Sequence, residues 1–200
     1  MMTVTLYVTN ARQLANHLPR ALSLLSPQRR AAAEGQWREQ DRLLRCGAGL
    51  LLRAVLGVEE ETLSVGEFGK PYLPHGPHFS LSYSGSCAVL AVSDEVVGAD
   101  VELLCRPDIL PRKMLTQEEM AWLCEHTDAA DYCLLWTRLE SALKAEGCGL
   151  AVEERTFSLL QNGAPWHWDS RLYDGHLITL AARQPFTVLT KEMTAEDLLQ

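Results

Sequence analysis

The chain has 200 residues, 47% hydrophobic and 22% charged, a composition typical of folded globular proteins that excludes wholesale disorder. Its 18 basic and 26 acidic residues give a net charge of −8, which argues against a general nucleic-acid binder. No apolar run approaches the roughly 20 residues needed to cross a bilayer, so we expect no membrane association.

The alternating segment Val4–Val8 predicts a strand at the start of the chain. Ser26-Pro27 has the form of an N-cap followed by proline at the first helical position, which predicts a long helical stretch. This stretch is expected to break near Gly35 and to end at about Leu56. The segment 68–77 contains three prolines and two glycines, and this composition predicts a loop. Three short strands are expected next, at Phe79–Tyr83, Cys87–Val92 and Val96–Leu104.

Arg106–Pro111 interrupts the pattern, and Thr116-Gln-Glu-Glu119 then forms a capping box that predicts the start of a helix. Asp131–Glu146 is the strongest helical segment, and Gly147 is expected to end it. A short C-terminal helix is expected to begin at Thr194. Four strand-like segments lie between these helices: Phe157–Leu160, Trp166–Trp168, His176–Ala182 and Phe186–Thr190.

The order of the elements predicts an α+β fold with two halves of similar size, residues 1–105 and residues 106–200. Charge is distributed unevenly between them. Residues 1–53 hold eight arginines against three acidic residues, a net charge of +5, whereas the remaining residues carry −13. This basic segment suggests an anion-binding surface, and a solvated helix face is an equally good interpretation.

Val97-Gly-Ala-Asp-Val-Glu102 contains two carboxylates separated by one residue. In a strand, Asp100 and Glu102 point to the same side and lie about 6–7 Å apart, so they repel each other unless a cation lies between them. A hard divalent cation such as Mg²⁺ suits two carboxylates, waters and substrate phosphates. A solvent-facing acidic edge remains the alternative.

In the helical segment after position 131, Trp136, Glu140 and Lys144 recur every four residues and therefore form one stripe. An exposed Glu140–Lys144 ion pair explains two of them, while the tryptophan indicates a partly buried face. A carboxylate and an ammonium there can serve a metal and a phosphate. Lys70, on the Gly/Pro-rich loop, and the serines of Phe79–Gly85 are further candidates for oxyanion contacts, although serine-rich turns are usually only turns.

Taken together and in order, these segments resemble the 4′-phosphopantetheinyl transferases of the Sfp type. The motifs that carry the resemblance span about 40% of the chain: Gly69-Lys-Pro71, Phe79-Ser-Leu-Ser-Tyr-Ser-Gly85, Val97-Gly-Ala-Asp-Val-Glu102, Leu115-Thr-Gln-Glu-Glu119, and Trp136-Thr-Arg-Leu-Glu-Ser-Ala-Leu-Lys-Ala-Glu-Gly-Cys-Gly-Leu150.

The resemblance implies two pseudo-symmetric α+β halves with the active site between them. It also implies a Mg²⁺-dependent enzyme that moves phosphopantetheine from coenzyme A to a serine of an apo acyl or peptidyl carrier protein, with release of adenosine 3′,5′-bisphosphate. The family's functional positions fall on the following residues: Asp100, Glu102 and Glu140 as metal ligands, Lys144 as a phosphate contact, Lys70 and Ser82 as coenzyme A contacts, and Glu119 as the acidic residue of the middle motif.

The carrier serine needs a base, for which Glu140 acting through a water and a metal-bound hydroxide are the candidates, and we favour Glu140. Two positions depart from the family pattern. Tyr83 replaces a histidine that helps to bind the 3′-phosphate, and Leu139 replaces a lysine. Losing two cations near a polyanion weakens binding, since charge-assisted contacts contribute about 1.5–3 kcal/mol each. Arginines of residues 1–53 can compensate, or they can dock an acidic carrier protein: Arg29, Arg38, Arg42 and Arg45.

Two rival functions remain. One is a carrier-protein-binding homologue with weak or lost catalysis, and the other is an unrelated Mg²⁺-dependent phosphohydrolase. The N-terminal segment lacks the basic region and cleavage site of a signal peptide, and the six cysteines show no C-x-x-C spacing, so a cytoplasmic protein is expected. A monomer is expected, because one chain supplies both walls of the cleft.

Overall fold

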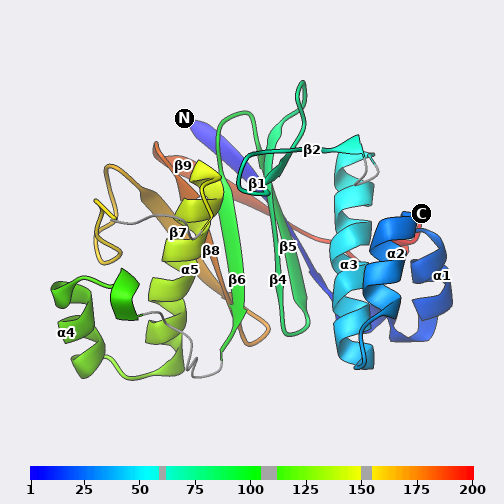
Figure 1. Cartoon of the computed structure of the whole chain (residues 1–200), viewed down its shortest axis with the longest axis horizontal. Coiled ribbons are helices and arrows are strands. Elements are labelled where there is room, and N and C mark those ends of the chain that lie inside the picture. The colour runs from blue at the N-terminus through cyan, green and yellow to red at the C-terminus, as the bar shows by residue number, and fades with distance from the viewer. Residues whose placement is uncertain (59–61, 105–111, 150–154) are drawn as a thin grey trace.

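The computed structural model describes residues 1–58, 62–104, 112–149 and 155–200. Two β-sheets pack against each other, and a group of helices covers the outer face of each (Figure 1). The α+β class predicted from the sequence is therefore confirmed.

The first sheet has the strand order β4-β5-β1-β9. β1 (Met2–Asn10) pairs antiparallel with β5 (Cys87–Ser93), and β5 pairs antiparallel with β4 (His78–Ser84). On its other side β1 pairs in parallel with β9 (Phe186–Glu192). The C-terminal strand therefore completes a sheet built mainly from N-terminal residues.

The second sheet has the order β6-β8-β7, with all neighbours antiparallel. β6 spans Gly98–Leu103, β7 spans His167–Tyr173 and β8 spans His176–Ala182. A two-stranded ribbon of β2 (Ser64–Val65) and β3 (Pro71–Tyr72) lies in the loop region before β4.

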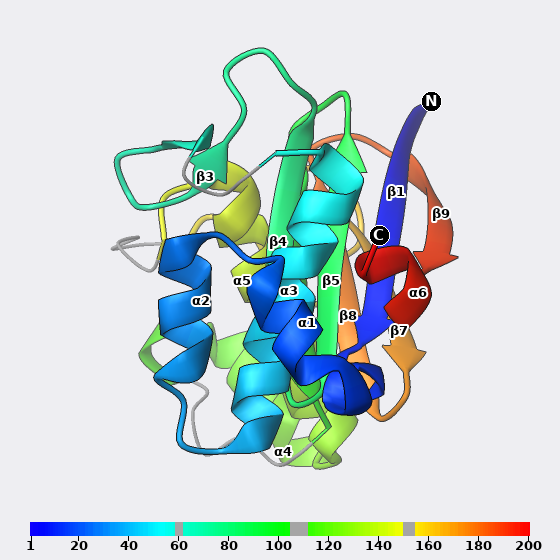
Figure 2. The same ribbon diagram turned by 90° about the vertical axis from the view of Figure 1, so that its right-hand side faces the viewer.

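The longest helix of the N-terminal half is α3 (Glu39–Leu56), which packs on the first sheet and ends at Gly57 with a positive φ of 65°. Figure 2 shows α3 and α1 in front of β4 and β5, with α2 to the left of α3. The Ser26 hydroxyl accepts a hydrogen bond from the Arg29 amide and thereby caps α2. The other helical segments around α3 are η1 (Ala11–His17), α1 (Leu18–Ser23), α2 (Pro27–Glu34) and the C-terminal α6 (Ala195–Leu198).

α5 (Ala129–Glu146) covers the second sheet and contacts β6 and β8. α4 (Gln117–Glu125) precedes it and begins with the predicted Thr116–Glu119 capping box, in which side chain and backbone bond reciprocally. A short 3₁₀ segment, η3 (Arg112–Met114), leads into α4. β6 approaches α5 so closely at Gly98 that a Cβ there would lie 1.8 Å from the backbone oxygen of Ser141.

Three apolar clusters correspond to the layers of the fold. The first lies between α3 and the first sheet, the second between the two sheets, and the third between α5 and the outer face of the second sheet. Alternation along the strands divides side chains between them: Val4, Leu6 and Val8 of β1 enter the middle cluster, whereas Tyr7 packs toward α3. Burying both faces of each sheet in this way supplies the main driving force for folding.

Most of the predicted elements are confirmed, and two need correction. Phe157–Leu160 is not a strand. Its apolar residues alternate because Leu159 is buried in the third cluster. The Leu159 amide donates to the Glu119 carboxylate instead of to a neighbouring strand. The strand expected at Trp166–Trp168 begins at His167 and continues to Tyr173. The helical turns at residues 11–23 were not anticipated. The break expected at 106–111 lies outside the described residues.

The division at residue 105 remains a prediction, and strand pairing crosses it in both directions. β6 pairs with β8, and β9 returns to pair with β1. Among the described residues, no helix combines the length and apolar character needed to cross a bilayer.

Candidate active site

The site lies where β4 of the first sheet runs beside β6 of the second. Serines at alternate positions of β4 bridge the two strands. The Ser80 hydroxyl accepts from the Ala99 amide at 2.9 Å, and the Ser84 hydroxyl accepts from the Leu103 amide at 3.3 Å. These side chains replace the backbone ladder that a continuous sheet would have, so the two sheets are joined through hydroxyl groups.

Asp100 lies in the seam between β4 and β6, with only 2% of its surface exposed. Its Oδ1 accepts hydrogen bonds from the Ser82 hydroxyl at 2.9 Å and from the Lys144 ammonium at 2.5 Å, while its Oδ2 is buried and has no hydrogen-bond partner within the part of the chain that the structure describes. The pKa of Asp100 is raised to about 6: burial raises it most and Glu102 also raises it, whereas Lys144 and the Ser82 hydroxyl lower it. The seam therefore holds a carboxylate whose charge is incompletely balanced.

Glu102 points to the same side of β6, as the strand alternation predicted, but uncharged donors hold it. The Trp136 indole N–H donates to Oε1 at 3.2 Å, and the Ser84 hydroxyl donates to Oε2 at 2.7 Å. Trp136 thus reaches the site from the α5 stripe that the sequence analysis singled out. Ser84 is one of the serines of Phe79–Gly85 that the sequence analysis gave as candidates for oxyanion contacts, and its spacing of two residues from Ser82 puts it on the same face of β4.

Glu140 lies on α5 one turn from both Trp136 and Lys144. Burial raises the pKa of Glu140, Lys144 lowers it, and Glu102 raises it. Because Glu102 acts electrostatically on both Asp100 and Glu140, the three predicted carboxylates share one electrostatic environment.

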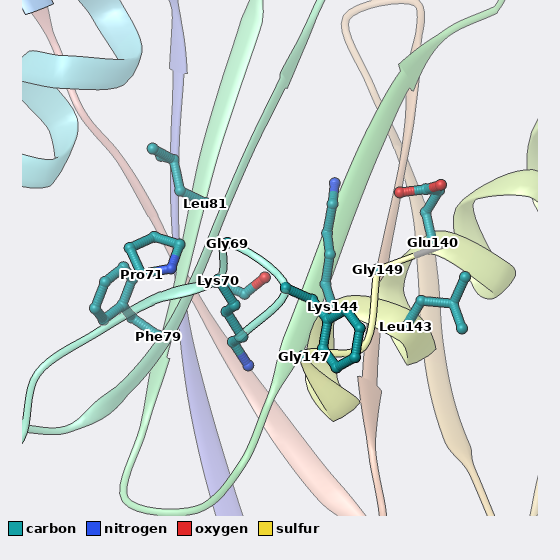
Figure 3. Close-up of a pocket in the computed structure, with 12 residues that line it drawn as sticks. Gly69, Lys70, Pro71, Phe79, Leu81, Glu140, Leu143, Lys144, Gly147 and Gly149 are labelled. Atoms are coloured by element: carbon teal, nitrogen blue, oxygen red, sulfur yellow. The ribbon is translucent and has the colours of Figure 1, made fainter. Parts of the chain in front are cut away.

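A pocket of about 290 Å³ opens beside these groups (Figure 3). Its polar lining includes Lys70, Glu140 and Lys144, so a loop lysine and a helix lysine meet at one cavity. The Lys70 ammonium bonds to the Ala145 carbonyl at 3.3 Å, and burial lowers its pKa. The rest of the wall comes from apolar side chains, from Ser80 and from glycines: Phe68, Pro71, Phe79, Leu81, Leu143, Gly69, Gly147 and Gly149.

The donors of the site suit a hard divalent cation in part. They are carboxylate oxygens, and the partnerless Oδ2 of Asp100 is an anionic acceptor in a buried position. However, no three acidic, histidine or cysteine side chains within the described residues gather closely enough to hold a metal, and Lys144 occupies Oδ1 of Asp100. Asp100 and Glu102 thus form one side of a cation site that Glu140 does not close in this arrangement.

Tyr83 and Leu139, the two departures from the family pattern, both face apolar surroundings. Tyr83 alternates with Ser82 along β4 and packs against the first cluster under α3. Leu139 is 1% exposed in the third cluster, where a lysine would be buried without water. No arginine of residues 1–53 lines the pocket described above.

The surroundings of Glu119 indicate that this residue stabilises the fold. It is fully buried and ion-paired with Arg155, and it accepts backbone hydrogen bonds from Thr116 at 3.0 Å and Leu159 at 2.7 Å. Burial raises its pKa, but the hydrogen bonds from Arg155 and the two amides outweigh burial, so the net pKa is lowered. Sequence reasoning missed Arg155, since nothing in its local pattern marks it as a buried partner.

Comparison with known proteins gives the family. A family model described as the 4′-phosphopantetheinyl transferase superfamily matches residues 96–181, which contain β6 and α5. A 4′-phosphopantetheinyl transferase of Bacillus subtilis is 31% identical over 172 residues, 78% of this chain and 75% of that protein. The 4′-phosphopantetheinyl transferase Sfp of Bacillus subtilis strain 168 is 26% identical over 152 residues, 70% of this chain and 68% of that protein.

A third relative, the 4′-phosphopantetheinyl transferase gsp of Aneurinibacillus migulanus, is 31% identical over 100 residues. That match covers 48% of this chain and 42% of the gsp protein. The chain belongs to the 4′-phosphopantetheinyl transferase superfamily. The enzyme class predicted from the sequence, a 4′-phosphopantetheinyl transferase, is confirmed with it.

Proposed function

We propose that this protein transfers the 4′-phosphopantetheine group of coenzyme A to a serine of an apo acyl or peptidyl carrier protein and releases adenosine 3′,5′-bisphosphate. The observation that carries the proposal is the ion pair of Asp100 with Lys144, which lies beside a pocket lined by Lys70, Glu140 and Lys144. Carboxylates and lysines at one cavity suit a substrate with a diphosphate bridge, because lysines bind phosphate oxygens and carboxylates would hold a divalent cation that neutralises phosphate charge.

Asp100 and Glu102 would hold Mg²⁺ from one side, with Oδ2 of Asp100 as the first acceptor, and Glu140 is the third ligand that the family resemblance implies. When bound, Mg²⁺ neutralises charge on the diphosphate and so stabilises the leaving group. Lys70 and Lys144 contribute positive charge to the pocket. Each charge-assisted contact with a phosphate oxygen contributes about 1.5–3 kcal/mol.

The transfer then requires the carrier serine oxygen to form a bond to the β-phosphorus, while the bond from that phosphorus to the bridging oxygen breaks. The electron pair leaves with adenosine 3′,5′-bisphosphate. The serine proton needs an acceptor, and we assign this to Glu140 acting through a water. In the metal-free protein burial raises the pKa of Glu140, which favours acceptance of a proton, whereas Lys144 and a bound cation lower it.

The seam between β4 and β6 also supports the two-half architecture that the family resemblance implied. Hydroxyl bridges join one strand of each sheet there, and a helix covers each sheet on the outside. We propose that the two halves are pseudo-symmetric, that coenzyme A binds between them, and that a single chain therefore suffices for activity.

The second candidate is a carrier-protein-binding homologue with weak or lost catalysis. The apolar surroundings of Tyr83 and Leu139 favour it, because both positions lack a cation that the family pattern supplies. The retained acidic groups favour catalysis, since Asp100 is buried at a cost that a non-catalytic surface has no reason to bear.

One assay distinguishes these functions. The protein is incubated with coenzyme A, Mg²⁺ and a panel of apo carrier proteins from fatty-acid, polyketide and peptide synthesis, and the carriers are weighed by mass spectrometry. A gain of one phosphopantetheine mass supports the transferase. Carrier binding without that gain supports the non-catalytic homologue, and release of free phosphate supports a phosphohydrolase.

A further inference from the structure

Asp100 and Glu102 are neighbours on one face of β6, yet their partners differ in charge. Glu102 is held by the Trp136 indole and the Ser84 hydroxyl, both neutral. Asp100 is held by the Lys144 ammonium at 2.5 Å and by the Ser82 hydroxyl at 2.9 Å. Of the described residues, only neutral donors hold Glu102, whereas the positively charged Lys144 already holds Asp100, so an approaching cation meets a like charge at Asp100 alone.

Lys144 is positioned so that its side chain can move away from Asp100 while the backbone keeps its fold. Its side chain is 30% exposed, whereas that of Asp100 is 4% exposed. Lys144 also lines the pocket, so its side chain contacts both the buried Asp100 and the cavity. Lysine has four rotatable side-chain bonds, and Lys144 already lines the pocket, so its ammonium has a route from Asp100 toward the cavity.

We infer that Lys144 is an exchangeable counterion: it neutralises Asp100 in the metal-free protein and moves to an anionic phosphate when a divalent cation binds at Asp100. The inference rests on the proposed function and adds to it a second role for Lys144, as the positioning residue of Asp100. Two cations a few ångströms apart repel each other, so metal and ammonium compete for the same carboxylate.

This exchange has a thermodynamic consequence. A divalent cation binds weakly on its own, because at Oδ2 of Asp100 it meets the like charge of Lys144 on Oδ1, and a Lys144 that moves away leaves its ammonium without an anionic partner. A bound phosphate supplies that partner. Metal and phosphate therefore bind with positive coupling, and by linkage each strengthens the other by the same factor.

The test measures Mn²⁺ binding, without coenzyme A or carrier, by electron paramagnetic resonance and by calorimetry. In Lys144→Met, Mn²⁺ is expected to bind about tenfold more tightly than in the unmodified protein, because one like charge has been removed. Lys144→Arg keeps the charge and is expected to bind as weakly as the unmodified protein. Lys70→Met is the matched control: it removes a pocket lysine that bonds the Ala145 carbonyl, and its Mn²⁺ affinity is expected to change less than twofold.

Lys144→Gln repeats the test with a side chain that can still hydrogen-bond to Asp100, and circular dichroism confirms that each variant is folded. A rise in melting temperature on adding Mn²⁺ should be larger in Lys144→Gln than in the unmodified protein. Equal or weaker Mn²⁺ binding in both folded, uncharged variants would overturn the inference. Failure of the proposed function is distinct, because it removes the mass gain of the carrier whatever the Mn²⁺ affinity.

Discussion

The ion pair between Glu119 and Arg155 gives the sharpest prediction about stability. Glu119 is fully buried, and Arg155 has a side chain that is 6% exposed. Replacing Glu119 with alanine leaves the guanidinium without its carboxylate and removes the acceptor of the Thr116 and Leu159 amides. Breaking a buried pair by removing one partner costs about 3–5 kcal/mol, so we expect Glu119→Ala to lower the free energy of unfolding by that amount.

The assay is urea unfolding at neutral pH, with Glu118→Ala as the matched control. Glu118 is an acidic neighbour in the same helical turn, but it is exposed, so its loss is expected to cost less than about 0.5 kcal/mol. The folded-state pKa of Glu119 is lowered, so its contribution is complete above the unfolded-state pKa and disappears as the pH falls through the folded value. The stability difference between Glu119→Ala and the unmodified protein should therefore shrink in acid. Equal urea midpoints for the two alanine variants would refute the reasoning.

Three further predictions concern the packing and the site. Gly98→Ala brings a methyl group to 1.8 Å from the Ser141 carbonyl and is expected to cost at least about 3 kcal/mol in urea unfolding, whereas Gly66→Ala, whose nearest contact is 3.5 Å away, serves as the control; equal midpoints would contradict the close approach of β6 and α5. Tyr83→His is expected to tighten coenzyme A binding about tenfold in calorimetry by adding a charge-assisted contact, and unchanged affinity would contradict that account. Asp100 has a pKa raised to about 6, so the folded metal-free protein binds the proton more tightly than the unfolded chain does, and stability should fall by roughly 3 kcal/mol as pH rises from about 4 to about 6. Asp100→Asn should abolish that slope, and a slope that persists in the variant would assign it to another group.

Local patterns predicted the elements well where the hydrogen-bonding groups of the backbone find partners a few residues away in the sequence. The capping box at Thr116, the proline after Ser26 and the left-handed glycine after Glu146 each mark a helix end through contacts a few residues away. The segment 157–160 was predicted wrongly for a related reason. Its backbone bonds to a carboxylate 40 positions earlier in the chain, and no local pattern encodes that partner.

The site could be predicted as far as the spacing of residues determines which way their side chains point. Alternation along β6 put Asp100 and Glu102 on one face, and helical spacing put Trp136, Glu140 and Lys144 on one stripe. Neither pattern predicts which of these side chains contact one another. The pairing of Lys144 with Asp100 depends on how α5 crosses β6, which Gly98 permits by allowing close approach.

The central claim is that this chain moves phosphopantetheine from coenzyme A to a carrier serine with the acidic groups of β6 and α5. The most direct measurement is the mass of an apo carrier protein after incubation with coenzyme A, Mg²⁺ and either the unmodified protein or Glu140→Gln. The account predicts a gain of one phosphopantetheine group with the unmodified protein and a rate at least 100-fold lower with Glu140→Gln, the scale of general base catalysis. A carrier that binds without any gain in mass, or a Glu140→Gln variant as active as the unmodified protein, would contradict it.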